Sequence, residues 1–126
     1  MLDQNPDRLL HVLSETVLAT VRRDSADLTA RQLAVFLTSY LAKGPHTVRG
    51  LAAELNVSKP AITRALDRLG KLGLTRRATD PFDRRSVHVQ QTPAGQTYLR
   101  DLKAAMSAAA GGAETQAAAT AQAAVA

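Results

Sequence analysis

Apolar residues recur at three- and four-residue spacing on both sides of a short break in the middle of the chain. The two sets are Val48, Leu51, Ala52 and Leu55 before the break, and Ile62, Leu66 and Leu69 after it. Asn56 lies at the break, where a positive φ is expected, and Ser58 can cap a second helix whose first turn contains Pro60. The pattern predicts two helices, 47–55 and 58–71, that meet at a tight corner as in a helix-turn-helix. An ordinary αα-hairpin fits the same spacing.

Two more helices are predicted before this pair. Asn5-Pro6-Asp7 combines a capping residue, a proline suited to a first turn and an acid near the positive end of the helix dipole. Thr29 and Gln32 form a capping box that starts the next helix, and Lys43-Gly44-Pro45 ends it. The first of these helices carries a wide apolar stripe, which fits either the core of a monomer or a dimer interface. We favour the dimer, because the stripe is wider than one neighbouring helix needs.

The pattern changes after Leu74, where β-formers alternate with polar residues around turn chemistry at 79–83. This predicts a two-stranded hairpin. A further helix starts at Thr92-Pro93, and from Ala104 onward thirteen of the twenty-three residues are alanine, interrupted by Gly111-Gly112. We therefore predict four segments. They are an N-terminal dimerisation helix (1–27), a domain with the helix pair and the hairpin (28–91, with the hairpin at 74–91), a C-terminal helix (92–110) and an alanine-rich tail (111–126).

Positive charge is concentrated in one part of the chain. The formal net charge is +5, yet residues 43–85 carry ten Lys or Arg against four acids, while the remainder carries six against seven. Such a concentration is typical of a protein that binds a polyanion. Six residues would lie on the outward face or the leading end of the second helix of the pair. They are Ser58, Lys59, Pro60, Thr63, Arg64 and Arg68.

These side chains suit the major groove of DNA. Arg64 can form two hydrogen bonds with guanine, and Ser58 and Lys59 suit phosphates or adjacent bases. For Arg64 and Arg68 the alternative is a solvated helix face. Arg84 and Arg85 at the hairpin tip can enter the minor groove.

Arg76 and Arg77 are adjacent on the first strand of the hairpin and therefore point to opposite faces. One should face phosphates and the other an acid of the chain, and the sequence does not say which.

Residues 51–74, Arg77, 80–86 and 92–95 together resemble the multiple-antibiotic-resistance regulator (MarR) family, over about residues 28–102. The resemblance implies a mainly α fold with a small β-hairpin, namely a winged helix-turn-helix flanked by N- and C-terminal dimerisation helices. It implies a cytosolic homodimer that binds double-stranded DNA. Members of the family are mostly repressors, and many are released from DNA by oxidation or by a small molecule, which here would be an effector of unknown identity.

The resemblance also implies that Asp80 and Asp83 position the tip arginines, with Asp67 a second partner for Arg85; the alternative is a flexible turn. The predicted dimer interface combines apolar residues of the first and last helices. These are Leu9, Leu13, Val17, Tyr98, Leu102 and Met106.

No enzyme constellation is apparent. His11, His46 and His88 lack the spacing of metal ligands, and there are no cysteines for disulfides or thiolate sites. We expect no cofactor, no metal and no membrane partner, and a cytoplasmic location. The alternative function is a winged helix that binds another transcription factor instead of DNA. Such a protein would tolerate loss of Arg64 and keep its partner at high salt.

Overall fold

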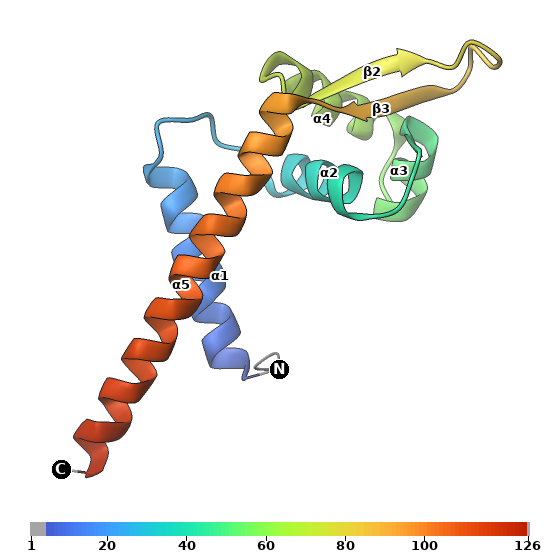
Figure 1. Cartoon of the computed structure of the whole chain (residues 1–126). Coiled ribbons are helices and arrows are strands. Elements are labelled where there is room, and N and C mark those ends of the chain that lie inside the picture. Colours follow the sequence, from blue (N-terminus) through green and yellow to red (C-terminus); the bar gives the residue numbers. More distant parts are fainter. Residues whose placement is uncertain (1–4, 126) are drawn as a thin grey trace. The chain divides into compact units, whose positions relative to one another are not determined.

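The computed structural model describes the backbone of residues 5–125 and the side chains of residues 5–112. The elements are α1 (Pro6–Arg22), α2 (Ala30–Leu41), β1 (His46–Thr47), α3 (Val48–Leu55), α4 (Lys59–Lys71), β2 (Thr75–Thr79), β3 (Val87–Gln91) and α5 (Pro93–Val125) (Figure 1). They form two compact units. Residues 28–98 make up the winged unit; the segments up to residue 27 and from residue 99 onward make up the helical unit. The predicted mainly α fold with a winged helix-turn-helix is confirmed.

The corner between α3 and α4 forms as its sequence predicts. Asn56 adopts the left-handed conformation (φ 54°, ψ 47°), which asparagine tolerates better than most residues. The amide of Val57 donates to the Ala52 carbonyl at 3.1 Å, which closes the turn. Ser58 Oγ then accepts from the Ala61 amide at 3.2 Å and caps α4. The cap and the left-handed residue fix where α3 ends and α4 begins.

The core of the winged unit is aliphatic with a small aromatic cluster. Its largest fully buried side chains are Phe36, Leu51, Ile62, Leu66, Leu69 and Val35. The ring of Phe36 stacks on Tyr40, with centroids 4.4 Å apart, and meets Tyr98 edge-on at 5.1 Å. Tyr98, which we assigned to a dimer interface, therefore contacts the core of its own winged unit. It is half-buried, so it offers less surface to a partner than the sequence suggested.

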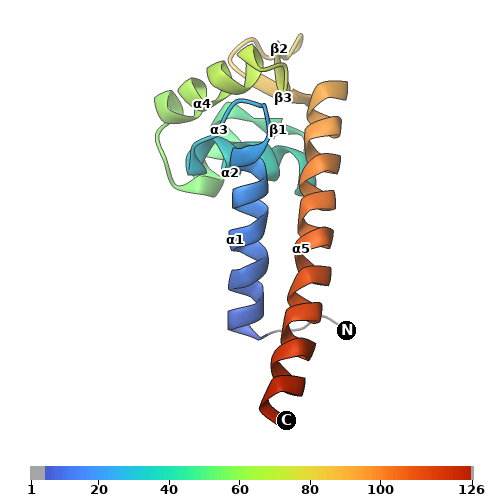
Figure 2. The ribbon, with the colours of Figure 1, turned by 90° about the vertical axis from the view of Figure 1, so that its left-hand side faces the viewer.

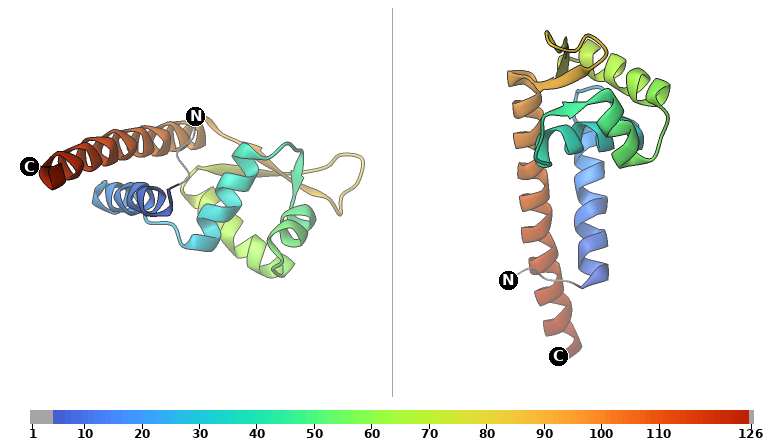
Figure 3. Two further views of the ribbon diagram at one scale, coloured as in Figure 1. Left: turned by 90° about the horizontal axis from the view of Figure 1, so that it is seen from below. Right: turned by 90° about the vertical axis from the view of Figure 1, so that its right-hand side faces the viewer.

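The sheet has one strand more than the predicted hairpin. Its order is β1-β3-β2, with all neighbours antiparallel. In β1, His46 pairs with Val89 and Thr47 with His88. Thr47 also caps α3 by accepting from the Gly50 amide at 2.9 Å. This short strand thereby joins the hairpin directly to the start of α3. In Figure 3 (left) the β2–β3 hairpin extends away from α2, α3 and α4.

A hydroxyl network fixes the start of α5 within the winged unit. Tyr40 Oη donates to the Leu74 carbonyl at 2.6 Å and accepts from the Thr92 amide at 3.0 Å. Thr92 Oγ1 donates to the Gly73 carbonyl at 2.6 Å. A Cβ atom at Gly95 would overlap both Tyr40 Oη and the Leu74 carbonyl oxygen. Gly95 is therefore required by this close approach.

In the helical unit, α1 runs beside α5 from residue 99 onward (Figures 2 and 3). Arg23 forms an ion pair with Asp101 at 3.4 Å. The apolar stripe of α1 stays largely exposed. Its exposed side chains are Leu9, Leu10, Leu13, Val17, Leu18 and Val21. Met106 on α5 is 47% exposed, and Leu102 is half-buried.

From the glycine pair we expected helix α5 to end near residue 110, and it does not. It continues through Gly111 and Gly112 to Val125. A glycine costs a helix only about 1 kcal/mol relative to alanine, and the surrounding alanines are the strongest helix formers. Residues 1–4 and 126 of the predicted terminal segments lie outside the described residues. Among the described helices, none is long and apolar enough to cross a membrane.

Candidate nucleic-acid interface

Helix α4 divides into a buried face and a polar face. Its buried residues are Ala61, Ile62, Ala65, Leu66 and Leu69. The remaining positions include Ser58, Lys59, Pro60, Arg64 and Arg68, all exposed, and Thr63, which is half-buried. These are the six residues that the sequence assigns to the major groove. The helix therefore presents hydrogen-bond donors along one side while its other side is held by the core, which suits base-edge contacts from a rigid element.

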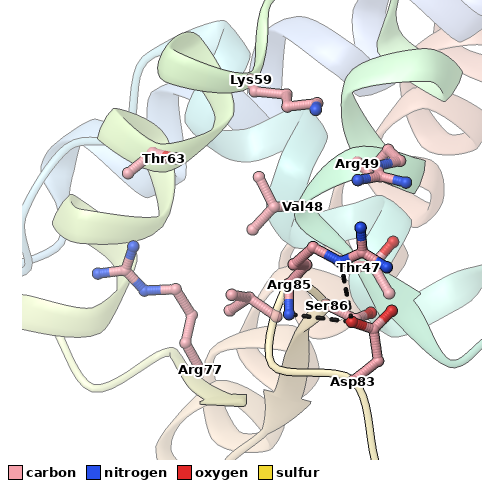
Figure 4. A pocket seen from close by; sticks show the side chains of 10 residues that line it. Thr47, Val48, Arg49, Lys59, Thr63, Arg77, Asp83, Arg85 and Ser86 are labelled. Carbon is pink, nitrogen blue, oxygen red and sulfur yellow. Dashed lines mark hydrogen bonds and ion pairs between the residues drawn. The ribbon is translucent and has the colours of Figure 1, made fainter. Parts of the chain in front are cut away.

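An open hollow of about 370 Å³ lies between the start of α3, α4 and the hairpin. Its lining residues are Thr47, Val48, Arg49, Lys59, Thr63, Arg77, Asp83, Arg85, Ser86 and Val87. Figure 4 shows Lys59 and Thr63 on α4 facing the same space as Arg49 of α3 and Arg85 of the wing. We call this space the basic groove. Its lining contains four cationic side chains and one carboxylate, so it attracts anions.

The wing loop, residues 80–86, is held by its own hydrogen bonds. Asp83 Oδ1 accepts from the Arg85 amide at 3.1 Å and lies 3.5 Å from Arg85 Nε. The Arg85 side chain is 88% exposed, so this pair positions the guanidinium without burying it. Arg84 is also exposed. Asp83 thus contacts one of the two tip arginines, as the resemblance implies.

Asp80 does not contact the tip arginines. It accepts a hydrogen bond from the Phe82 amide at 2.8 Å, and its other oxygen lies 3.2 Å from His88 Nε2. The Phe82 hydrogen bond chiefly, and His88 next, lower the pKa of the Asp80 carboxyl. The expectation for Asp80 is therefore wrong as to its partner. Asp80 shapes the loop through backbone and histidine contacts, because it sits at the loop entrance rather than at its tip.

Asp67 pairs with Arg77 rather than with Arg85. The Arg77 guanidinium donates to Asp67 Oδ1 at 2.5 Å, across the turn between α4 and β2. Of the two adjacent arginines on the first strand of the hairpin, Arg77 is therefore the one that faces an acid. Arg76 is exposed. Arg77 also lines the basic groove, so the ion pair holds a cation at the edge of that groove.

The sequence pointed to neither Thr47 nor Arg49 as a site residue, and both line the basic groove. Arg49 was one of the ten basic residues between 43 and 85, and its place at the start of the first helix of a helix-turn-helix is the signal that could have found it. Arg31 was also missed. It lines a second hollow, beside α4, together with Arg64. That proximity depends on the packing of α2 against α4, which local patterns do not specify.

Comparisons with known proteins agree with this geometry. The model of the MarR family matches residues 28–87. Among solved structures, the crystal structure of MarR is 26% identical, covering 83% of this chain and 78% of that chain with a TM-score of 0.63. YusO from Bacillus subtilis is 21% identical, covering 97% of each chain with a TM-score of 0.66. No curated protein matches the chain.

A structure of overoxidized AbfR bound to DNA is 23% identical, covering 81% of this chain and 71% of that chain with a TM-score of 0.61. At their level of identity, YusO and AbfR show that the fold is shared. The family match falls on the segment that contains the helix-turn-helix, the basic groove and the wing loop. Residues 28–87 thus match the MarR family, and the solved structures that share the fold include transcriptional regulators of that family.

Proposed function

We propose that this protein represses transcription by binding a palindromic operator as a homodimer. The observation that carries the proposal is the basic groove, in which Arg49, Lys59, Arg77 and Arg85 come from separate elements to one open face. A groove of exposed cations beside an amphipathic helix matches the needs of a duplex, whose phosphates bind cations and whose bases are read from the major groove.

In this proposal α4 lies in the major groove. Arg64 donates to a guanine, while Ser58, Lys59 and Thr63 reach phosphates or neighbouring bases. Arg68 and Arg76 extend the positive surface. Arg31 contacts a phosphate beside Arg64, since the two line a common hollow. These contacts would divide the interface into one part that reads sequence and one that fixes position on the duplex.

The wing would supply the second type of contact. Arg84 and Arg85 enter the minor groove, where an A·T-rich stretch concentrates negative potential. Asp83 supports this by holding Arg85 at the loop backbone. The resulting contact would depend on groove width and salt more than on individual base pairs.

The homodimer rests on the helical unit. The stripe of α1, including Leu9, Leu13 and Val17, is about half exposed, and Met106 of α5 adds to it. Two copies that bury these stripes against each other would bring two α4 helices to one duplex, and the half-sites of such dimers lie about 34–36 Å, one turn of the duplex, or a multiple of it apart. Because such a dimer has two-fold symmetry, its operator would be palindromic.

Ligand control belongs to the same proposal. A small molecule releases the operator only if it binds the DNA-free conformation better than the DNA-bound one. Thermal-shift screening followed by operator titration tests this directly. A compound that raises the melting temperature and leaves operator affinity unchanged is a ligand but not an effector.

Selection from a pool of random-sequence duplexes tests the proposed function. We expect wild-type protein to enrich a palindrome, and Arg64→Ala to enrich a motif relaxed at one position in each half-site. Mapping of genomic occupancy then gives the regulated promoters. Absence of any enriched duplex, together with a protein partner retained at high salt, would favour the protein-interaction alternative.

A further inference from the structure

Phe82 stands at the tip of the wing loop with its side chain 98% exposed. Among the described residues with large apolar side chains, no other is as exposed. A single exposed apolar residue is common on protein surfaces and carries little meaning alone. Two further features indicate that this exposed ring makes a binding contact. They are the hydrogen bonds of its loop and the charges beside it.

Several hydrogen bonds close the loop that carries Phe82. The Asp80 amide donates to the Ser86 carbonyl at 2.9 Å, and the Ser86 amide donates to the Asp83 carbonyl at 2.9 Å. Asp80 Oδ1 accepts from the amide of Phe82 itself at 2.8 Å. The backbone that presents the ring is therefore ordered before any partner arrives. Little backbone entropy is therefore lost when the ring is inserted into a binding site.

The chemistry around the ring favours a polyanion. Arg84 and Arg85 lie two and three residues further along the chain, after Asp83, and are exposed. The acids of the loop are already engaged, Asp80 with His88 and Asp83 with Arg85. An aromatic ring with exposed guanidinium groups beside it suits a site that offers both phosphates and a stacked, apolar surface. The duplex minor groove offers both, and proteins insert apolar side chains there between base steps.

We propose that Phe82 acts as a wedge that enters the minor groove flanking each half-site and partly unstacks one pyrimidine–purine step. Such steps unstack more readily than others, so the wedge selects sequence without a hydrogen bond to a base. The inference rests on the proposed function, since it requires a bound duplex. It deepens that function by assigning a specificity element to the wing.

The test uses the duplex enriched by wild-type protein, with 2-aminopurine replacing one flanking adenine at a time. We expect binding to raise the fluorescence at one step beside each half-site, because unstacking relieves quenching of that base. Phe82→Ala should abolish the rise and weaken binding about tenfold, the scale of a lost aromatic–base contact. Phe82→Leu should retain part of both. Leu41→Ala, which truncates another exposed apolar side chain of the winged unit, should change neither.

A second arm changes the DNA. Replacing the unstacked step with a stiff A-tract should weaken binding by the wild type but not by Phe82→Ala, because only the wedge requires a deformable step, while the narrow groove of an A-tract still favours Arg84 and Arg85. The wedge is wrong if Phe82→Ala binds like wild type, or if the fluorescence rise persists in that variant. If wild-type protein enriches a duplex but leaves every base stacked, the result contradicts the wedge alone and not the proposed function. A wild-type protein that enriches no duplex removes the proposed function as well.

Discussion

The two units differ in how far they bury their apolar residues. The winged unit buries Phe36, Leu51 and Ile62 almost completely and exposes cations, whereas α1 of the helical unit leaves Leu13 58% exposed and Val17 48% exposed. The hydrophobic effect is therefore largely satisfied within the winged unit and remains available in the helical unit. We infer that the charged surface of the first unit meets DNA and the apolar surface of the second meets another copy.

The largest effect should come from placing charge on the α1 stripe. Leu13→Glu with Val17→Glu should convert the dimer into a monomer, and operator affinity should fall by about 10²–10⁴, the advantage that two linked half-site contacts provide. Light scattering and operator titration measure the two changes. Leu41→Glu, which alters a side chain of the winged unit that is 63% exposed, should leave the mass unchanged. Wild-type protein that has a monomer mass at micromolar concentration would contradict the division between the units.

Glycine-to-alanine substitutions should also have opposite effects on the stability of the two units. Gly95→Ala in the winged unit forces a Cβ atom into Tyr40 Oη, and should lower the free energy of unfolding by about 1–3 kcal/mol, the usual cost of overpacking. Gly112→Ala in the helical unit meets nothing within 4 Å and should raise stability by up to about 1 kcal/mol. Urea unfolding followed by circular dichroism gives both values. Equal effects of the two substitutions would show that the Tyr40 network is not tightly packed.

Arg64→Ala tests whether the exposed face of α4 reads sequence. Operator binding should weaken by about 1–3 kcal/mol, with less discrimination at one position in each half-site. Lys71→Ala is the control, because it removes a charge from the same helix at a residue outside both hollows. Titration against the selected duplex and single-base variants measures discrimination. Unchanged discrimination in Arg64→Ala would assign this arginine to phosphate contact or to solvent.

The smallest effect concerns Asp80 and appears only in acid. Hydrogen bonding lowers the pKa of its carboxyl from the ordinary 3.8, so the folded state holds this proton less tightly than the unfolded state. The resulting stabilisation is present above about pH 3.8, the ordinary pKa that the unfolded state retains, and is lost as the pH falls through the lower folded-state pKa. Asp80→Asn should therefore lose its stability difference from wild type below about pH 4. Urea unfolding at pH 7, 5 and 3 provides the comparison, and a constant difference would mean that the carboxylate does not contribute through its charge.

Local signals predicted most of the winged unit. The caps at Thr29 and Ser58, the corner at Asn56 and the spacing of Ile62, Leu66 and Leu69 each depend on neighbours within about one helical turn, and sequence patterns capture such neighbours well. The two-residue strand β1 escaped prediction because two residues are too few to show alternation.

The details of the site were harder to predict, because they depend on contacts between elements that are far apart in the sequence. The pairing of Asp67 with Arg77 depends on which face of β2 each arginine takes, and the proximity of Arg31 to Arg64 depends on how α2 packs against α4. Residue types and spacing do not determine either contact. The basic character of the region was predictable from charge alone, whereas the groove itself required the fold.

The salt dependence of operator affinity in wild type, Arg85→Ala and Asp83→Ala tests the central claim most directly. We expect Arg85→Ala to lower the slope of log affinity against log salt by roughly one or two per dimer, since each wing gives up at most about one neutralised DNA charge. Lys103→Ala, which removes an exposed charge in the helical unit, should leave the slope unchanged. Asp83→Ala should weaken binding, because its carboxylate holds Arg85, although removing an acid near phosphates would otherwise strengthen it. Wild-type affinity and slope in both wing variants would contradict the account.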